Sequence, residues 1–126
     1  MTPITCACER CRNACARSTC LPTPEEARAL IRAGLGDRLA TYEFDGQRFV
    51  GPAPKGREGE RGLWHTRHEG GCTFFDGRDC ELHARGLKPL EGRLAHHDRP
   101  WQPIRAHVMS HWRGKRFESV LQTMRA

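Results

Sequence analysis

The sequence contains no long hydrophobic run, and no segment reaches the 18 consecutive apolar residues expected of a membrane-spanning helix. Its beginning, MTPITCACERC, also lacks the apolar stretch behind a basic start that is typical of a secretory signal peptide. We therefore expect a cytoplasmic protein with no membrane association. Disulfides rarely persist in the cytoplasm, and seven cysteines, an odd number, do not favour a closed disulfide set.

The patterns of common catalytic sites are also missing. The sequence has no H-E-x-x-H motif and no Ser, His and Asp order, and no apolar strand leads into the glycine-rich stretch GREGERG. A metal-dependent enzyme would need an open coordination position beside an acid or base. Asp79 and Glu81 flank Cys80, but acidic residues at such positions are usually ordinary turn or surface residues. The sequence thus does not favour an enzyme, but it leaves open whether the protein is one.

Apolar residues are scarce and lysine is scarcer. Only 37% of the 126 residues are hydrophobic, so a single domain would have a thin core that cross-links or metal ions would help to stabilise. The net charge of +6 comes almost wholly from arginine, with 18 Arg against 3 Lys. Residues 96–126 carry +4 of it. Such a basic tail can bind nucleic acid or an acidic protein, although a solvated surface is the commoner interpretation.

Capping and turn residues predict a small α+β fold of four or five short helices with one or two short β-hairpins. Thr23 begins a capping box with Glu26 that starts a helix, and Gly34 ends it. Asp45-Gly46 in YEFDGQRFV predicts a hairpin turn, and CTFFDGRDCEL (residues 72–82) suggests a second hairpin. The glycine-rich residues 51–62 between them predict a surface loop.

The C-terminal part predicts three further helices. Pro89 fits the start of a short helix through Leu94. Two apolar stripes of helical spacing follow, separated by Gly114: Ile104, Val108 and Trp112, then Phe117, Val120, Leu121 and Met124. We interpret residues 1–126 as one metal-binding domain, in which 6–95 form a cysteine-rich core with its hairpin and 96–126 a basic helical tail packed on it.

The cysteines fall into two groups with the spacing of metal ligands. Residues 6–20 read CACERCRNACARSTC, and a short helix over 8–16 would place Cys8, Cys11 and Cys15 on one face. A second group follows far downstream, where Cys80-x2-His83 has metal-ligand spacing. One metal ion could bind ligands from both groups and so hold the two segments together. The candidate metal ligands are Cys8, Cys11, Cys15, Cys72 and Cys80, then Cys20 and His83, with Cys6 optional.

Zinc is the expected metal, because tetrahedral zinc takes four cysteine or histidine donors. Eight donors would suffice for two zinc ions, for one four-cysteine site with spare thiols, or for a thiolate-bridged pair. Iron, or an iron–sulfur cluster, is the alternative, because thiolates bind both. The spacing C-x2-C-x3-C-x4-C differs from the ferredoxin pattern.

Three stretches, CERCRNAC, TPEEARALI and CTFFDGRDCELHARGLKPLEGR, resemble the YkgJ-like family of zinc- or iron-chelating proteins of bacteria and phages, with its CxxCxxCC-type cluster. The resemblance covers residues 6 to about 95 and implies metal binding. Two family features are absent: Ala16 follows Cys15 in place of an adjacent cysteine, and Gly92 stands where the family carries a cysteine. His83 occupies a position where the family often has tyrosine.

These observations together predict a metal-binding protein whose zinc is mainly structural and whose basic surface meets a protein partner. Two alternatives remain open: a zinc protein that binds nucleic acid through the same surface, and an iron or iron–sulfur protein with redox or metal-dependent activity. The sequence does not indicate an oligomeric state.

Overall fold

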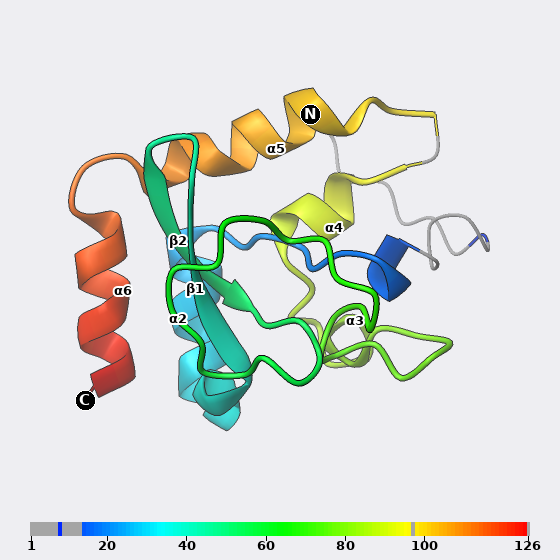
Figure 1. The fold of residues 1–126 in the computed structure, drawn as a ribbon, viewed down its shortest axis with the longest axis horizontal. Helices are drawn as coiled ribbons and strands as arrows, with labels where there is room; N and C mark the ends of the chain where they lie inside the picture. The colour runs from blue at the N-terminus through cyan, green and yellow to red at the C-terminus, as the bar shows by residue number, and fades with distance from the viewer. Residues whose placement is uncertain (1–7, 9–13, 97, 126) are drawn as a thin grey trace.

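The computed structural model describes residue 8, residues 14–96 and residues 98–125. Within these residues the chain forms five short α-helices and one two-stranded antiparallel sheet, which confirms a small α+β fold (Figure 1). The elements are α2 (Pro24–Leu30), β1 (Leu39–Phe44), β2 (Gln47–Pro52), α3 (Glu81–Ala84), α4 (Leu90–Leu94), α5 (Trp101–Met109) and α6 (Arg116–Arg125). Shorter helical turns are η1 (Ala14–Ala16), η2 (Ile31–Leu35), η3 (Gly36–Arg38) and η4 (Ser110–Trp112).

Helix α2 begins where the capping box predicts, but it ends at Leu30, before the predicted end at Gly34. The Thr23 hydroxyl accepts a hydrogen bond from the Glu26 amide at 3.2 Å, and the Glu26 carboxylate accepts one from the Thr23 amide at 2.9 Å, so the capping box is present. The π-helical turn η2 continues the helix to Gly34, whose φ of +84° suits glycine and ends it. Glu26 also accepts from the Leu90 amide, which ties α2 to the start of α4.

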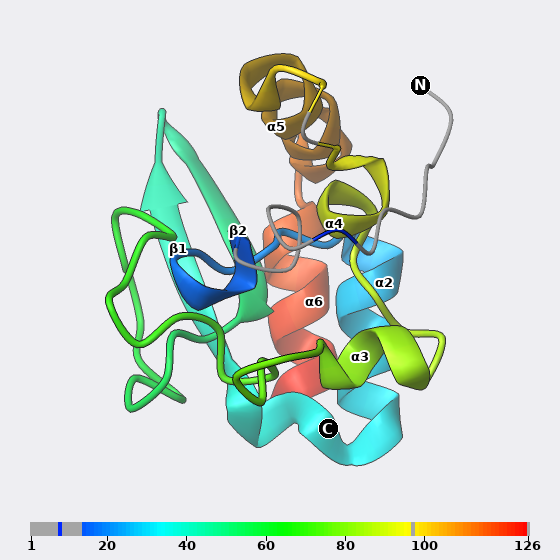
Figure 2. The ribbon, with the colours of Figure 1, turned by 90° about the vertical axis from the view of Figure 1, so that its right-hand side faces the viewer.

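The hairpin β1–β2 turns at Asp45 and Gly46, whose φ angles of 52° and 73° are those of a type I′ turn. One side of the hairpin packs against α2 and α6, which lie next to each other in Figure 2. The long loop of residues 53–75 covers the other side. It follows the outer edge of β1, where the Leu63 amide donates to the Thr41 carbonyl at 2.9 Å.

The second expected hairpin forms a turn rather than a strand pair. The Asp76 carboxylate accepts from the amides of Arg78 and Asp79, and one isolated bridge joins Phe75 to Cys80. The return arm does not extend because α3 begins at Glu81, whose amide donates to the Phe74 carbonyl. Of the helix expected over residues 8–16, only η1 lies within the described range, together with Cys8; residues 9–13 lie outside it.

Both apolar stripes of the C-terminal part pack inward, as predicted. Ile104, Val108 and Trp112 are buried, and the Trp112 indole N–H donates to the Pro22 carbonyl at 2.9 Å. In α6, Phe117 and Val120 are buried. Gly114 separates the two stretches with a φ of +74°. None of the described helices is long and apolar enough to cross a membrane.

Tyr42 is fully buried in β1 and its hydroxyl joins three segments. It donates to the Pro52 carbonyl at 2.6 Å and lies 3.0 Å from the Thr19 hydroxyl. We predict that Tyr42→Phe lowers the free energy of unfolding by about 1–3 kcal/mol, because it leaves the Pro52 carbonyl and the Thr19 hydroxyl without their partner. Chemical denaturation measures the change. Ser110→Ala is the control that should stay near wild type, because the Ser110 hydroxyl bonds to the His107 carbonyl at the surface.

Alkaline pH gives a second readout of the same side chain. Burial raises the pKa of Tyr42 above its ordinary value. The unfolded tyrosine therefore ionises near about pH 10 while the folded one resists, so the wild type loses stability as the pH rises through that value. Tyr42→Phe lacks this component, and the stability gap between the two proteins should narrow above pH 10. The proposed role of the Tyr42 hydroxyl is contradicted if wild type and Tyr42→Phe are equally stable at neutral pH, or if their difference in stability increases with pH.

Candidate metal site

The N-terminal segment of the described chain lies along the end of the long loop. The Cys72 amide donates to the Cys15 carbonyl at 2.9 Å, and the His68 amide donates to the Arg17 carbonyl at 2.8 Å. An antiparallel bridge joins Ser18 to Arg67. This backbone pairing brings cysteines from the two sequence groups next to each other.

Gly71 makes this close pairing possible. Its φ is +75°, and a Cβ atom at this position would lie 2.5 Å from the Cys15 carbonyl oxygen and 2.8 Å from Ala16 Cα. Both contacts are with backbone, so a side chain could be accommodated only if the two segments separated. Glycine is therefore required at position 71 for steric and conformational reasons together.

Four free thiols meet in this region. Cys15 and Cys72 are buried, with 8% and 5% of their surfaces exposed, and Cys20 and Cys80 are half-buried. Side-chain hydrogen bonding with Cys20, opposed by Cys80, raises the pKa of Cys15 to about 12. Burial, together with the nearby thiols of Cys15 and Cys80, raises the pKa of Cys72 to about 12. The thiols are thus neighbours, and without a cation those of Cys15 and Cys72 are protonated at neutral pH.

Backbone amides point toward two of the sulfur atoms. Side-chain hydrogen bonding with Cys15 and burial raise the pKa of Cys80, whereas the amides of His83 and Leu82 at the start of α3 lower it. The Phe74 amide likewise lowers the pKa of Cys72. Amide donors favour the charged form of an acceptor, so these two positions are suited to thiolates once a cation balances the charge.

The expected ligands are only partly brought together. Across the described ranges, no set of three or more histidine, cysteine, aspartate or glutamate side chains is arranged so that it could hold a metal ion. Cys6 and Cys11 lie outside those ranges, and Cys8 is described there without its sequence neighbours. His83 is exposed on α3. The ligand ranking made from the sequence therefore stays a prediction.

Sequence reasoning missed two residues at this site, Lys88 and Gly92. The Lys88 ammonium lowers the pKa of Cys15 by its charge. A Cβ on Gly92 would lie 3.0 Å from Cys20 Sγ and 2.9 Å from Lys88 Cε, so α4 packs its glycine against the thiols. The signal that could have found Gly92 is its place in KPLEGR, at the position of the cysteine in the YkgJ-like pattern.

The basic tail is partly neutralised by carboxylates of the core. Arg105 forms a half-buried ion pair with Glu91, with 2.8 Å between the Arg105 Nη2 and Glu91 Oε1 atoms. Arg116 pairs with Glu25 at 3.1 Å. Arg113 and Lys115 are exposed. The cationic surface of the tail is therefore smaller than the count of its arginines suggests.

No protein family, curated protein or solved structure matches the chain significantly. The resemblance to the YkgJ-like family stays a prediction, and the function has to be argued from the residues themselves.

We predict that Gly71→Ala separates the Cys15 and Cys72 segments and lowers the melting temperature more than Gly56→Ala does. Gly56 is the matched control because its φ of +82° carries the same conformational penalty, while a Cβ there would meet no atom within 4 Å. The difference between the melting temperatures of the two variants therefore measures the effect of the steric clash at position 71. Equal melting temperatures for the two variants would show that the segments can separate at no cost.

Proposed function

We propose that this chain is a cytoplasmic metal-binding protein in which thiols of the N-terminal segment and of the 72–80 turn bind zinc. The observation that carries the proposal is the proximity of Cys15 and Cys20 to Cys72 and Cys80, because the two pairs are far apart in sequence and are brought together by backbone pairing. Free thiols that gather in this way in a reducing compartment are typical of metal sites.

The composition of the site fits a thiolate-bound metal. Its donors are sulfur, the preferred ligand of zinc and of iron–sulfur clusters. The amides of Phe74, Leu82 and His83 would stabilise the thiolates, which is the usual role of groups that surround metal ligands. Since the described thiols do not converge on one point, we propose that Cys8 and Cys11 complete the coordination.

A structural role for the metal follows from where the thiols lie. Cys15 and Cys72 are buried between the N-terminal segment and the loop, so a metal there would add to the hydrogen bonds that join these two segments. Gly92, which stands where the YkgJ-like family carries a cysteine, packs against Cys20, and this contact supports the proposal. Iron in place of zinc is the alternative that these donors also allow.

The partner expected from the sequence is a protein that meets the basic tail. Arg113 and Lys115 are the exposed cations on which such a contact would depend, since Arg105 and Arg116 are engaged by glutamates of this chain. This partner stays a prediction, and the metal proposal does not depend on it.

The test is elemental analysis of protein purified without oxygen, with an absorption spectrum of the same sample. We predict zinc bound at close to a whole-number ratio and no visible absorption, whereas iron would colour the protein. Cys11→Ser, Cys72→Ser and Cys80→Ser should each lower the metal content, and Cys6→Ser, the optional ligand, should change it little. Metal-free wild type, or full metal content in Cys72→Ser and Cys80→Ser, contradicts the proposal.

Chelation tests the structural role separately. Metal binding to such sites is coupled to folding and contributes on the order of 10 kcal/mol or more in small zinc domains. We predict that a strong chelator lowers the melting temperature of the reduced wild type sharply, and that added zinc restores it. An unchanged melting temperature in protein shown to be metal-free would separate metal binding from a structural role.

A further inference from the structure

Two tryptophans are exposed to an extent that is unusual for such large side chains. Trp64 in the long loop is 74% exposed and Trp101 at the start of α5 is 64% exposed. The Trp64 ring meets the His65 ring edge to face, with 4.1 Å between their centroids. Tryptophan is normally largely buried, and aromatic side chains left on a surface are common in binding sites.

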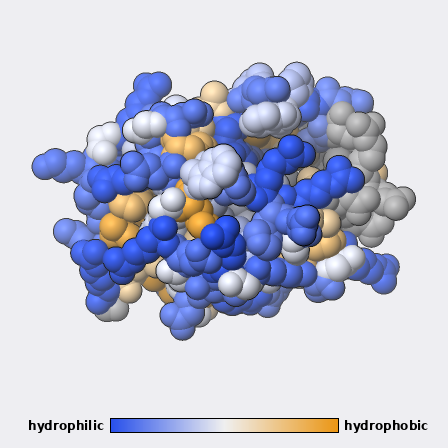
Figure 3. Space-filling model, viewed as in Figure 1, coloured by the Kyte–Doolittle hydropathy of each residue, from blue (hydrophilic) through white to orange (hydrophobic). Residues whose placement is uncertain are grey.

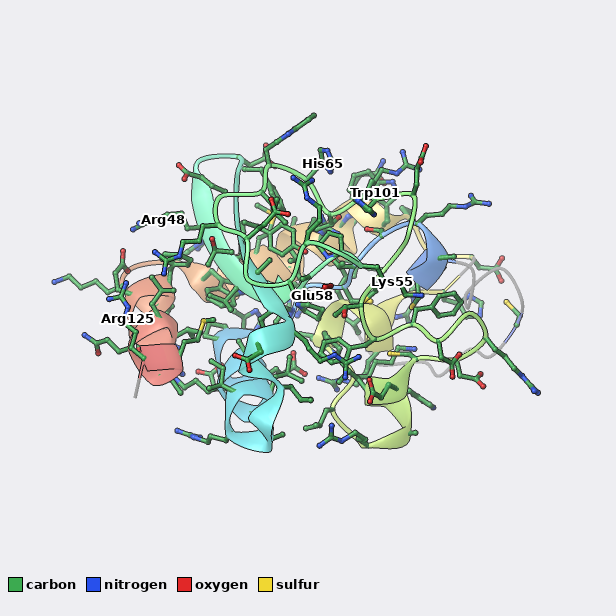
Figure 4. The ribbon with its side chains drawn as sticks, turned by 60° about the horizontal axis from the view of Figure 1, so that its bottom comes forward. Arg48, Lys55, Glu58, His65, Trp101 and Arg125 are labelled. Atoms are coloured by element: carbon green, nitrogen blue, oxygen red, sulfur yellow. The ribbon has the colours of Figure 1, made fainter. Side chains whose placement is uncertain are left out.

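The two tryptophans belong to neighbouring parts of the surface. Thr66, two residues after Trp64, accepts a hydrogen bond from the Arg105 guanidinium at 3.2 Å, which joins the loop to α5. Arg105 lies one helical turn after Trp101, so both share a face of α5. Figure 4 shows His65 and Trp101 on the same side of the molecule, far from Arg125 at the end of α6.

A hollow of about 330 Å³ lies between α5 and the tip of the hairpin, beside Trp101. Its lining combines an aromatic ring, two guanidinium groups and side-chain amides: Asp45, Gln47, Trp101, Gln102, Arg105 and Arg113. The side-chain amide oxygen of Gln47 (Oε1) is buried and has no hydrogen-bond partner among the described residues.

We propose that this surface binds single-stranded nucleic acid, with one base stacked on Trp101 in the hollow and a second stacked on Trp64. Arg113, which is exposed at the rim, would contact the phosphates, and the exposed side-chain amide of Gln102 would meet base edges. Exposed aromatic rings beside cationic groups are the usual means by which proteins bind single strands.

The surroundings of the tryptophans favour nucleic acid over a protein partner. Anchor residues of protein interfaces sit at the centre of a well-packed patch that excludes water. The long loop lies on the face of the molecule shown in Figure 3. This face is mostly hydrophilic, and apolar residues appear on it only in small patches. The chain also carries a net charge of +6, which attracts a polyanion. Arg105 is held by Glu91 and Thr66, so this part of the surface is preorganised.

The experiment is a titration of fluorescein-labelled single-stranded 12-mers, oligo-dT and oligo-U, with the full chain as purified, at low and physiological salt. Wild type should bind and its tryptophan fluorescence should be quenched. Trp101→Ala should weaken binding by about fivefold or more at fixed salt, and Trp64→Ala by a similar factor. Trp101→Phe should retain most of the affinity, because phenylalanine also stacks. Both tryptophans are exposed, so unchanged melting temperatures should show that the variants fold.

A matched pair of charge reversals separates this site from general attraction. Arg113→Glu and Arg125→Glu change the net charge equally, but only Arg113 lines the hollow beside Trp101. Arg113→Glu should weaken binding more strongly. Equal losses, equal affinity for duplex DNA of the same length, or alanine variants that bind like wild type would overturn the proposal. Binding of an acidic peptide, with loss in Trp101→Ala and no oligonucleotide binding at low salt, would assign the surface to a protein partner.

Discussion

The approach of Gly71 to the Cys15 carbonyl is the contact on which the rest of the structure depends. It allows residues 15–19 to pair with the end of the long loop through a series of backbone hydrogen bonds, which ends where the Thr19 amide donates to the Thr66 carbonyl. The Thr19 hydroxyl then meets Tyr42 in the centre of the hairpin. One glycine thus determines whether the N-terminal segment, the loop and the sheet share a core.

The same contact explains why a metal suits this fold. Bringing the segments together buries thiols that are protonated at neutral pH, since the pKa values of Cys15 and Cys72 are raised to about 12. Buried thiols contribute only as small apolar groups, and the core is thin. A cation would turn such thiols into thiolates, and backbone amides are placed to stabilise two of them: the Phe74 amide at Cys72 and the amides at the start of α3 at Cys80. A metal would therefore add cohesion where apolar packing is weakest.

Local signals in the sequence were sufficient for most of the helices and for the hairpin. The capping box at Thr23, the left-handed Gly34 and the turn at Asp45-Gly46 each depend on residues a few positions apart, so their geometry can be read from a short window. The second hairpin was the exception. Its arms are too short for a ladder, and α3 takes over the return arm at Glu81.

The candidate site was less predictable, because it depends on contacts between distant segments. Cysteine spacing singled out the thiols, but nothing local indicates that Gly71 must accept the backbone of Cys15. The exposed Trp64 carried no signal at all, since exposure of a single residue cannot be inferred from a polar segment around it. Long-range packing decides such features, and it leaves no periodic pattern.

A polar network links the thiol segment to the tryptophan surface. Glu91 accepts from the Leu21 amide, directly after Cys20, and also from Arg105, which in turn donates to Thr66 two residues from Trp64. Each member is fixed by at least one partner from another segment, so Glu91 and Arg105 connect residues 15–21 to the hollow beside Trp101. One short chain of hydrogen bonds thus joins the two proposed sites.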